Sequence, residues 1–431
     1  MSLQVWGVFG RKFGPIVHQR TKPGRGCVLK LRRIAAPLVI GLLGWLNSSS
    51  GEGVNSSQAP SGAHIVIGVS NVQSGPSSAL GRKLLEGSKA YFDLVNSSGG
   101  IHGRKVDILV KDDHYEPDPA VQNTNDLITK DRVFFLFDYV GTPTLTRVLP
   151  LLKYYAGEDI VNVAPFTGAD PQRKPPYDKF VFNVRASYAD ETRALVRYLY
   201  AKGYRRIGFL GQADAYGKSG ESGVKEALSA YGLSIVESAT YRRNQPPETS
   251  MREQVQILRS KGVDAVISVG VYGPCAAFIR DARQAGWQGP IANLSFVGAE
   301  LMLKALADYS RKAGIDLTAD LIDSQVVPSP DEVKYPLVAS YRAHVPQDAQ
   351  GFISLEGWLN AAVVSEALKR AGPSPSRADF IKAMESLSGW DPGLGAKLEF
   401  SATQHQGMHK VWLTKTVQGR WVREDVPGAA L

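Results

Sequence analysis

Cysteine is scarce in this chain, and long hydrophobic runs are absent. The 431 residues include two cysteines, Cys27 and Cys275. Cys27 precedes the first apolar run and is expected to leave with an N-terminal leader, so Cys275 would remain alone. One thiol cannot form an intrachain disulfide or a cysteine-based metal cluster. No stretch approaches the ~20 apolar residues that a membrane-spanning helix needs. A disulfide-built fold and a multi-span membrane protein are therefore excluded.

Acidic side chains are missing from the first 46 residues, which hold eight of the 50 lysines and arginines. The rest of the chain carries nearly equal numbers of basic and acidic residues, so the formal net charge of +9 arises from the N-terminal segment. Because the rest of the chain is nearly neutral, it lacks the excess of basic residues that binds the phosphates of nucleic acids. We therefore expect no nucleic-acid partner.

The basic segment runs into IAAPLVIGLLGWL at residues 34–46, which has the ~7–15 apolar residues of a secretory h-region. Small polar residues follow as far as residue 63. We interpret residues 1–63 as an export signal with a flexible lead-in, which predicts a periplasmic protein. An uncleaved anchor is the alternative, and translation starting near Val28 would give a leader of more usual length.

With 43% hydrophobic residues, the chain can bury a sizeable core, and short apolar runs alternate with helical patterns along it. Strands are expected at residues 65–69, 106–110, 133–137, 160–163, 206–210, 234–238, 265–269, 291–293, 397–400 and 410–415. Helices are expected at residues 80–95, 119–130, 143–155, 189–202, 217–231, 251–261, 274–285, 352–370 and 377–386. This alternation predicts an α/β protein with two doubly wound parallel sheets.

Sequence signatures of catalysis are missing. The loop GQADAYGKS resembles a phosphate loop, but Gly211 and Gly217 enclose five residues where a Walker A loop has four. No strand is followed by G-x-G-x-x-G, and no G-x-S-x-G elbow occurs. His405 and His409 lack the glutamate of H-E-x-x-H. We expect no enzyme activity, no catalytic residue, no metal and no cofactor.

Candidate ligand contacts stand where strands end and helices begin. Thr142 occupies an expected N-cap with Pro143 at the first helical position, leaving first-turn amides free for a carboxylate. Simple capping by Thr142 is the alternative. Tyr216 and Tyr272 lie just before helices in the second unit, at the strand ends where open α/β sheets bind ligands. These tyrosines would either form the wall of a ligand pocket or only pack against neighbouring residues.

Five segments carry a family resemblance over residues 65–412. They are residues 65–75 leading into SGP, GGIHGRKVDILVKDD, the GTPT turn, AYGKSG and VGVYGP. In this order they resemble the periplasmic Leu/Ile/Val-binding protein family. The resemblance implies a type I periplasmic binding protein of Venus-flytrap form, whose two lobes are joined by three crossovers. Such a protein closes on a small molecule and delivers it to the permease subunits of an ABC importer, without catalysis.

The resemblance also implies a domain division and a set of ligand contacts. Residues 64–185 with 326–398 would form the first lobe, and residues 186–325 with 399–431 the second, in a monomer. Position by position, the family's ligand contacts fall on Leu80, Gly141, Thr142, Phe166, Gly168, Tyr216 and Tyr272. Where amino-acid binders have a glutamate for the ligand ammonium, this chain has Ser295.

This departure leads to a hypothesis about the ligand. We expect a small carboxylate with an apolar or aromatic body, whose main anchor is not an α-ammonium. Glu300 or Asp214 would have to approach the ligand to restore amino-acid binding. Two other classes of function stay open, a ligand-sensing module that feeds a signalling receptor and an enzyme without a recognisable motif.

Overall fold

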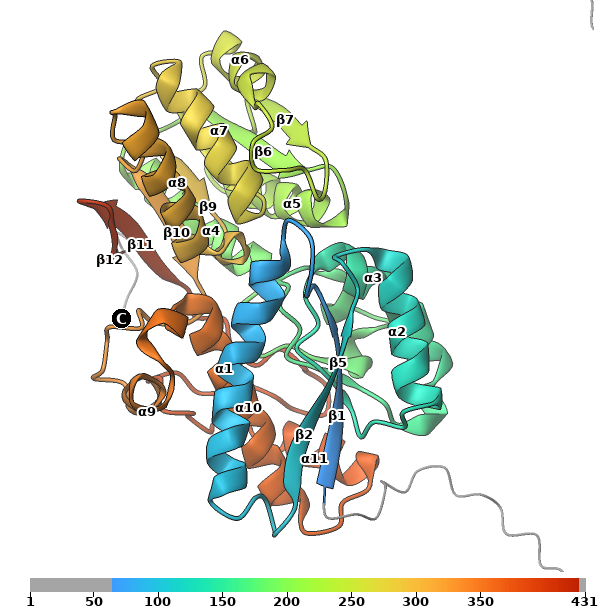
Figure 1. Ribbon diagram of the computed structural model, residues 1–431. Helices are drawn as coiled ribbons and strands as arrows, with labels where there is room; N and C mark the ends of the chain where they lie inside the picture. The colour runs from blue at the N-terminus through green and yellow to red at the C-terminus, as the bar shows by residue number, and fades with distance from the viewer. Residues whose placement is uncertain (1–63, 426–431) are drawn as a thin grey trace, which may run out of the picture. The chain divides into compact units, whose positions relative to one another are not determined.

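The computed structural model describes residues 64–425. The predicted export signal at residues 1–63 lies outside this range. None of the helices in the described range has the length and apolar character needed to cross a membrane. Two sheets with their covering helices make up this part of the chain (Figure 1).

The first sheet is parallel throughout and has the strand order β2-β1-β3-β4-β5. Its strands are β1 (His64–Asn71), β2 (Lys105–Asp112), β3 (Leu136–Phe137), β4 (Asn162–Val163) and β5 (Val181–Phe182). The helices that belong with it are α1 (Ser78–Ser97), α2 (Pro117–Thr129), α3 (Thr142–Tyr154), α9 (Pro336–His344), α10 (Phe352–Ala371) and α11 (Arg377–Glu385). We call these elements the first lobe.

The second sheet has the order β12-β11-β10-β9-β8-β6-β7, parallel from β10 to β7 and antiparallel at β11 and β12. Its strands are β6 (Ile207–Gln212), β7 (Glu237–Tyr241), β8 (Ala265–Val269), β9 (Ile291–Asn293), β10 (Leu321–Gln325), β11 (Trp412–Val417) and β12 (Arg420–Glu424). Its helices are α4 (Tyr188–Ala201), α5 (Ala215–Ser229), α6 (Arg252–Ser260), α7 (Tyr272–Gln284) and α8 (Ala299–Ala313). These elements form the second lobe.

The chain passes between the lobes three times: after β5, after β10 and before β11. This confirms the predicted α/β architecture of two doubly wound lobes. Phe400 and Met408 pack in the core of the first lobe, whereas β11 and β12 extend the second sheet.

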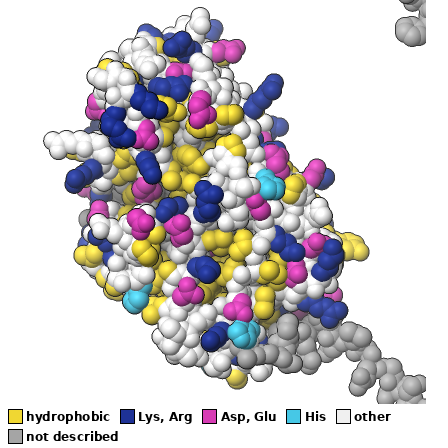
Figure 2. All heavy atoms as spheres, in the orientation of Figure 1, with side chains coloured by type: hydrophobic (Ala, Val, Ile, Leu, Met, Phe, Trp, Pro, Cys, Tyr) yellow, Lys and Arg dark blue, Asp and Glu magenta, His cyan; other side chains and the backbone are white. Residues whose placement is uncertain are grey.

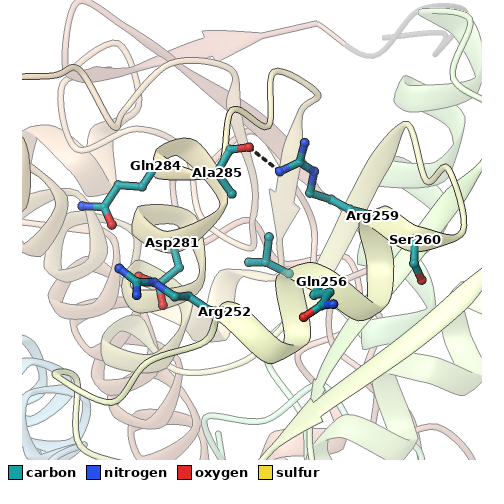
Figure 3. A pocket seen from close by; sticks show the side chains of 8 residues that line it. Arg252, Gln256, Arg259, Ser260, Asp281, Gln284 and Ala285 are labelled. Carbon is teal, nitrogen blue, oxygen red and sulfur yellow. Dashed lines mark hydrogen bonds between the residues drawn. The ribbon is translucent and has the colours of Figure 1, made fainter.

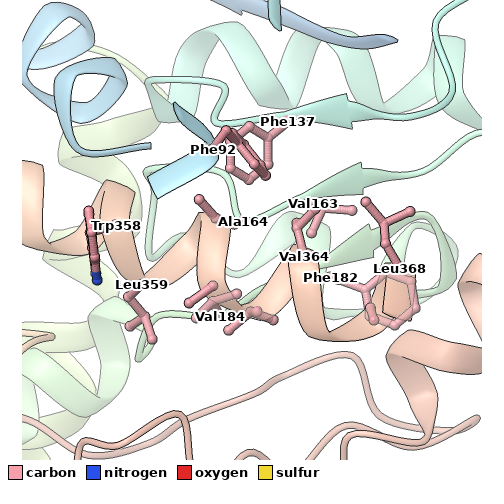
Figure 4. Packing of buried hydrophobic residues seen from close by; sticks show 14 of the residues in the cluster. Phe92, Phe137, Val163, Ala164, Phe182, Val184, Trp358, Leu359, Val364 and Leu368 are labelled. Carbon is pink, nitrogen blue, oxygen red and sulfur yellow. The ribbon is translucent and has the colours of Figure 1, made fainter. Parts of the chain in front are cut away.

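The core of the first lobe lies between its sheet and the pair α1 and α10 (Figure 4). Phe92 of α1 packs edge-on against Phe137 of β3, with ring centroids 5.8 Å apart. The two helices run side by side at very close range (Figure 1). A Cβ added to Gly87 would lie 1.7 Å from the carbonyl oxygen of Ser354. Glycine is therefore required at this helix contact.

The predicted strand at residues 397–400 is wrong. Leu398 is buried and exchanges backbone hydrogen bonds with Gly389 and Trp390, but the segment joins no sheet. The side chains of residues 397–400 alternate between exposed and buried because of the path of an irregular loop, not because of pairing in a β-sheet. The sequence pattern also does not predict α8, α9, β5, β10 and β12.

Candidate functional site

The predicted ligand contacts gather around a buried cluster formed at the carboxyl ends of strands from both sheets. Val140 and Phe166 follow β3 and β4 of the first lobe, while Tyr216 and Phe296 follow β6 and β9 of the second. Leu80, near the start of α1, belongs to the same cluster. This edge is where open α/β sheets bind ligands.

Aromatic rings from both lobes meet in this cluster. The Phe296 ring lies 5.1 Å from that of Phe166 and 4.7 Å from that of Tyr216, measured between centroids. Tyr188 lies 5.3 Å from Tyr216, and Tyr115 lies 6.3 Å from Phe296. All five side chains are buried. The aromatic rings thus form an apolar contact between the two lobes at this edge.

Thr142 does not cap its helix as predicted. Helix α3 begins at Thr142, and Gly141 occupies the N-cap without a side-chain hydrogen bond. The Thr142 hydroxyl instead lies 2.7 Å from that of Thr167 and 3.5 Å from that of Tyr188. The helix starts one residue early because Gly141 adopts φ 108°, which only glycine tolerates well. Thr142 therefore presents its hydroxyl inside the cluster.

Two predicted glycines allow close approach of neighbouring rings. A Cβ on Gly141 would lie 2.3 Å from Cε2 of Tyr115, and one on Gly168 would lie 2.4 Å from Cδ1 of Tyr188. Neither position has room for a side chain. Both glycines therefore set the positions of aromatic side chains in the cluster.

Tyr272 lies at the edge of the cluster rather than in its centre. It is the first residue of α7, and its hydroxyl donates a 2.5 Å hydrogen bond to the carbonyl of Pro76 in the first lobe. Tyr216, by contrast, is fully buried as the second residue of α5, and its hydroxyl donates to the carbonyl of Gly270 at 3.4 Å. The structure thus brings Tyr216 into the cluster and leaves Tyr272 bridging the lobes.

Ser295 lies beside a buried charge that sequence analysis missed. Its hydroxyl accepts a hydrogen bond from Nη2 of Arg185, which follows β5. Glu191 and Glu356 lie 3.6 Å and 3.5 Å from the guanidinium, measured between nitrogen and oxygen. Burial disfavours the charge of Arg185, but Glu356 and Glu191 more than offset this, so its pKa is raised. Burial raises the pKa of Glu356 to about 7, although Arg185 opposes the shift.

An ion pair between Arg243 and Glu116 also joins the two lobes. Arg243 of the second lobe forms a 2.7 Å ion pair with Glu116 of the first and a 3.1 Å ion pair with Asp214. Asp214 also caps α5 by accepting from the amide of Tyr216. Glu300 accepts from the amide of Phe352. The two acidic residues considered for an ammonium anchor thus have partners of their own.

Hollows on the surface of the described residues lie apart from this buried cluster. One of about 540 Å³ lies between α6 and α7 and is lined by Arg252, Arg259 and Asp281, among others (Figure 3). None of the predicted contacts lines it. The face drawn in Figure 2 carries interspersed basic and acidic side chains. No group of three or more potential metal-ligating side chains occurs within residues 64–425.

Comparison with known proteins agrees with this geometry. The sequence pattern that defines the periplasmic binding protein family matches residues 64–420. The chain belongs to this family. It is 22% identical over 343 residues to Leu/Ile/Val-binding protein homolog 3 of Brucella melitensis, covering 79% of this chain and 88% of that relative.

Two solved structures share the fold of this periplasmic binding protein. A possible leucine/isoleucine/valine-binding protein from Rhodopirellula baltica is 30% identical with a TM-score of 0.76, covering 86% of this chain and 98% of that one. A substrate-binding periplasmic protein from Ralstonia solanacearum is 29% identical with a TM-score of 0.75, covering 84% and 100%. The family and the type I binding-protein fold expected from the sequence are both confirmed.

Five residues in or beside the cluster were not predicted from the sequence: Tyr115, Thr167, Arg185, Tyr188 and Phe296. One of them had a visible signal. Arg185 follows VFNV, the segment that begins with β5, and charged residues in such positions are rarely buried without partners. The aromatic residues had no distinguishing pattern, because apolar residues after a strand usually pack in a core.

Proposed function

We propose that this chain is the extracytoplasmic solute-binding component of an ABC importer. It binds a small carboxylate or an amino-acid-like molecule between its two lobes. The names of the Brucella and Rhodopirellula relatives refer to leucine, isoleucine and valine, and family membership supports a binding role. In this proposal the protein works as a monomer and catalyses no reaction. Besides the ligand, its only partners are the permease subunits.

The observation that carries the proposal is the composition of the buried cluster. Phe166, Tyr216 and Phe296 supply aromatic surface from both lobes, while Thr142 supplies a hydroxyl at the start of α3. Among residues 64–425, no side chain caps α3, so its first turn keeps backbone donors for an anion, and the helix dipole favours negative charge there. A carboxylate at α3 with its apolar body on the rings fits this arrangement.

The first experiment identifies the ligand directly. Mature protein purified from the native host without refolding is analysed by native mass spectrometry, and a released small acid or amino acid is expected. Adding that compound to ligand-free protein should raise its melting temperature, because a ligand that binds only the folded state stabilises it. Absence of any bound or stabilising small molecule would contradict the solute-binding role.

A pair of variants on one helix tests the site. Thr142→Val removes the hydroxyl in the cluster and should weaken binding by about tenfold, which corresponds to ~1.4 kcal/mol for a lost hydrogen bond to a charged group. Thr146→Val makes the same change on the same helix, at a hydroxyl that has no hydrogen-bond partner in the described residues. It should leave binding unchanged. Equal affinities of the two variants would place the ligand elsewhere.

Closure and export are tested separately. Ligand should compact the molecule, since candidate contacts lie on both lobes, and coinciding X-ray scattering profiles with and without saturating ligand would contradict closure. In our proposal the leader is removed within residues 46–63, leaving a periplasmic protein. N-terminal sequencing of exported protein tests this, and retention of residues 34–46 would indicate a membrane-anchored form.

A further inference from the structure

A set of polar contacts, which we call the clasp, joins loops of the first lobe to loops of the second. It is formed by Pro76, His114 and Glu116 of the first lobe with Arg243, Asn244 and Tyr272 of the second. Arg243 and Glu116 form a 2.7 Å ion pair, and Asn244 donates to the same carboxylate at 2.8 Å. All six residues follow the carboxyl ends of β1, β2, β7 and β8.

The clasp lies far from the three crossovers. In the first sheet, β2 and β1 are at the edge opposite β5, after which the first crossover leaves. In the second sheet, β7 is an edge strand, and β6, β8 and β9 separate it from β10, where the second crossover leaves. The first crossover also arrives beside β10, because Glu191 of α4 accepts from the Ser324 hydroxyl at 2.7 Å. Contacts far from a hinge separate most when two lobes open.

The Glu116 side chain serves the contact between the lobes rather than its own helix. Glu116 occupies the N-cap of α2, but its side chain makes no capping hydrogen bond. Its Oε2 accepts from Arg243 and its Oε1 from Asn244. Both carboxylate oxygens therefore bind the second lobe, and opening of the lobes would break both hydrogen bonds.

Arg243 is held in position for this contact by its own lobe. Its Nη1 donates to Asp214 at 3.1 Å, while its Nη2 donates to Glu116. Asp214 is fixed in turn, because it accepts from Gln212 at 2.8 Å and from the amide of Tyr216 at 2.9 Å. The guanidinium therefore points to the first lobe without an additional loss of side-chain freedom on closure.

The backbone on both sides of the clasp adopts left-handed conformations. His114 and Tyr115 have φ 55° and φ 60°, and Asn244 has φ 55°. Such conformations are costly for residues other than glycine and persist only where surrounding contacts hold them. The Tyr115 hydroxyl accepts from Gln212 of the second lobe at 3.2 Å. The turn that carries Tyr115 and Glu116 is thus held by contacts with the opposite lobe.

The charges of the clasp are partly exposed to solvent, unlike the aromatic cluster. The side chains of Arg243 and Glu116 are 23% and 42% exposed. Dissolved salt screens an ion pair at such a position, whereas it has little effect on buried groups. The contribution of the clasp to closure should therefore depend on ionic strength.

We propose that the Arg243–Glu116 ion pair of the clasp favours the closed arrangement of the lobes and makes the frequency of their opening depend on ionic strength. A contact made only in one arrangement lowers the free energy of that arrangement relative to the other. This inference rests on the proposed solute-binding function, in which opening admits and releases the solute.

Hydrogen–deuterium exchange of the purified mature protein tests the inference without knowledge of the solute. Residues 139–145 and 294–298 contribute to the buried cluster from the two lobes, so lobe opening exposes them. Residues 265–269 form β8 inside the second lobe and report its unfolding. Arg243→Gln should raise the exchange rate of the two cluster segments by about two- to fivefold, the range expected for one partly exposed ion pair. Exchange of residues 265–269 should stay unchanged.

The control variant is Arg242→Gln, which removes the same charge one residue earlier. Arg242 is exposed, and its side chain forms no hydrogen bond or ion pair within residues 64–425. This variant should exchange as the parent does. Glu116→Gln and the double variant Arg243→Gln/Glu116→Gln should resemble Arg243→Gln, because effects of two partners in one contact do not add. Raising NaCl from about 50 to about 500 mM should speed exchange of the cluster segments in the parent but not in the double variant.

Three results would overturn the inference. They are equal exchange of the cluster segments in Arg243→Gln and Arg242→Gln, an equal salt response in the parent and the double variant, and an increase in Arg243→Gln that extends to residues 265–269. The last result would show that Arg243 stabilises the second lobe itself. Failure of the solute-binding proposal is detected separately, because the co-purification experiment shows whether a small molecule is bound whatever the exchange rates are.

Discussion

Replacing Gly141 by alanine is predicted to destabilise the first lobe and weaken ligand binding. Gly141 has φ 108° and ψ 140°, a backbone region almost restricted to glycine, where another residue costs about 1–3 kcal/mol. The added Cβ would also lie 2.3 Å from Cε2 of Tyr115. That ring is buried, and its hydroxyl accepts from Gln212 at 3.2 Å, so it has little freedom to move. Overpacking of this kind costs about 1–3 kcal/mol.

The two costs together give a loss of about 2–6 kcal/mol in the free energy of unfolding. Thermal melts should show this as a decrease of roughly 4–24 °C, at about 2–4 °C per kcal/mol. Ligand affinity should also fall, because a displaced Gly141 shifts the start of α3 and the Thr142 hydroxyl. The matched control is Gly157→Ala, where an added Cβ meets no atom within 4 Å. If both variants melt and bind alike, the close contact at Gly141 does not shape the site.

Three further predictions concern other parts of the fold. Gly87→Ala should cost about 1–3 kcal/mol by urea unfolding, because its Cβ would collide with the carbonyl of Ser354; an unchanged midpoint would contradict the helix contact. Burial raises the pKa of the Cys275 thiol to about 12, so iodoacetamide at pH 8 should label it only after denaturation. Burial opposes ionisation of Asp190, but hydrogen bonds from His409 and Ser187 lower its pKa to about 2. The hydrogen bond with Asp190 in turn raises the pKa of His409. Urea midpoints should therefore fall as pH decreases from about 4 towards 2, and also as pH rises above about 6.5 through the raised pKa of His409; Asp190→Asn should reduce both slopes.

Much of the fold was predictable because both lobes repeat a regular alternation. Strands at residues 265–269 and 291–293 match β8 and β9 as predicted, since short apolar runs between helices have few other structures available. The failures have more than one cause. Strands β3, β4 and β5 each have two residues, so their bounds depend on pairing with neighbours rather than on sequence pattern. Helix α8 buries only Ala299, Met302 and Leu306, which gives a weak apolar stripe.

The candidate site was predictable where it depends on local chain geometry. Tyr216 and Phe166 lie after strands whose carboxyl ends form one edge of each sheet, so strand prediction alone brings them to that edge. Tyr272 follows the same rule but points to Pro76 across the lobes. Position after a strand thus identifies the edge on which a residue lies, whereas the direction of its side chain depends on packing with the other lobe.

The contact between Arg185 and Ser295 shows why ligand class is harder to predict than fold. The two residues are 110 positions apart and lie on opposite sides of the first crossover. No periodicity links them, and a serine at position 295 is equally compatible with a site that lacks an ammonium anchor and with one that holds an arginine. Only the packing of one lobe on the other decides which acceptors reach the guanidinium. The charge at this contact is therefore a property of the two lobes packed together, and neither lobe's sequence carries it alone.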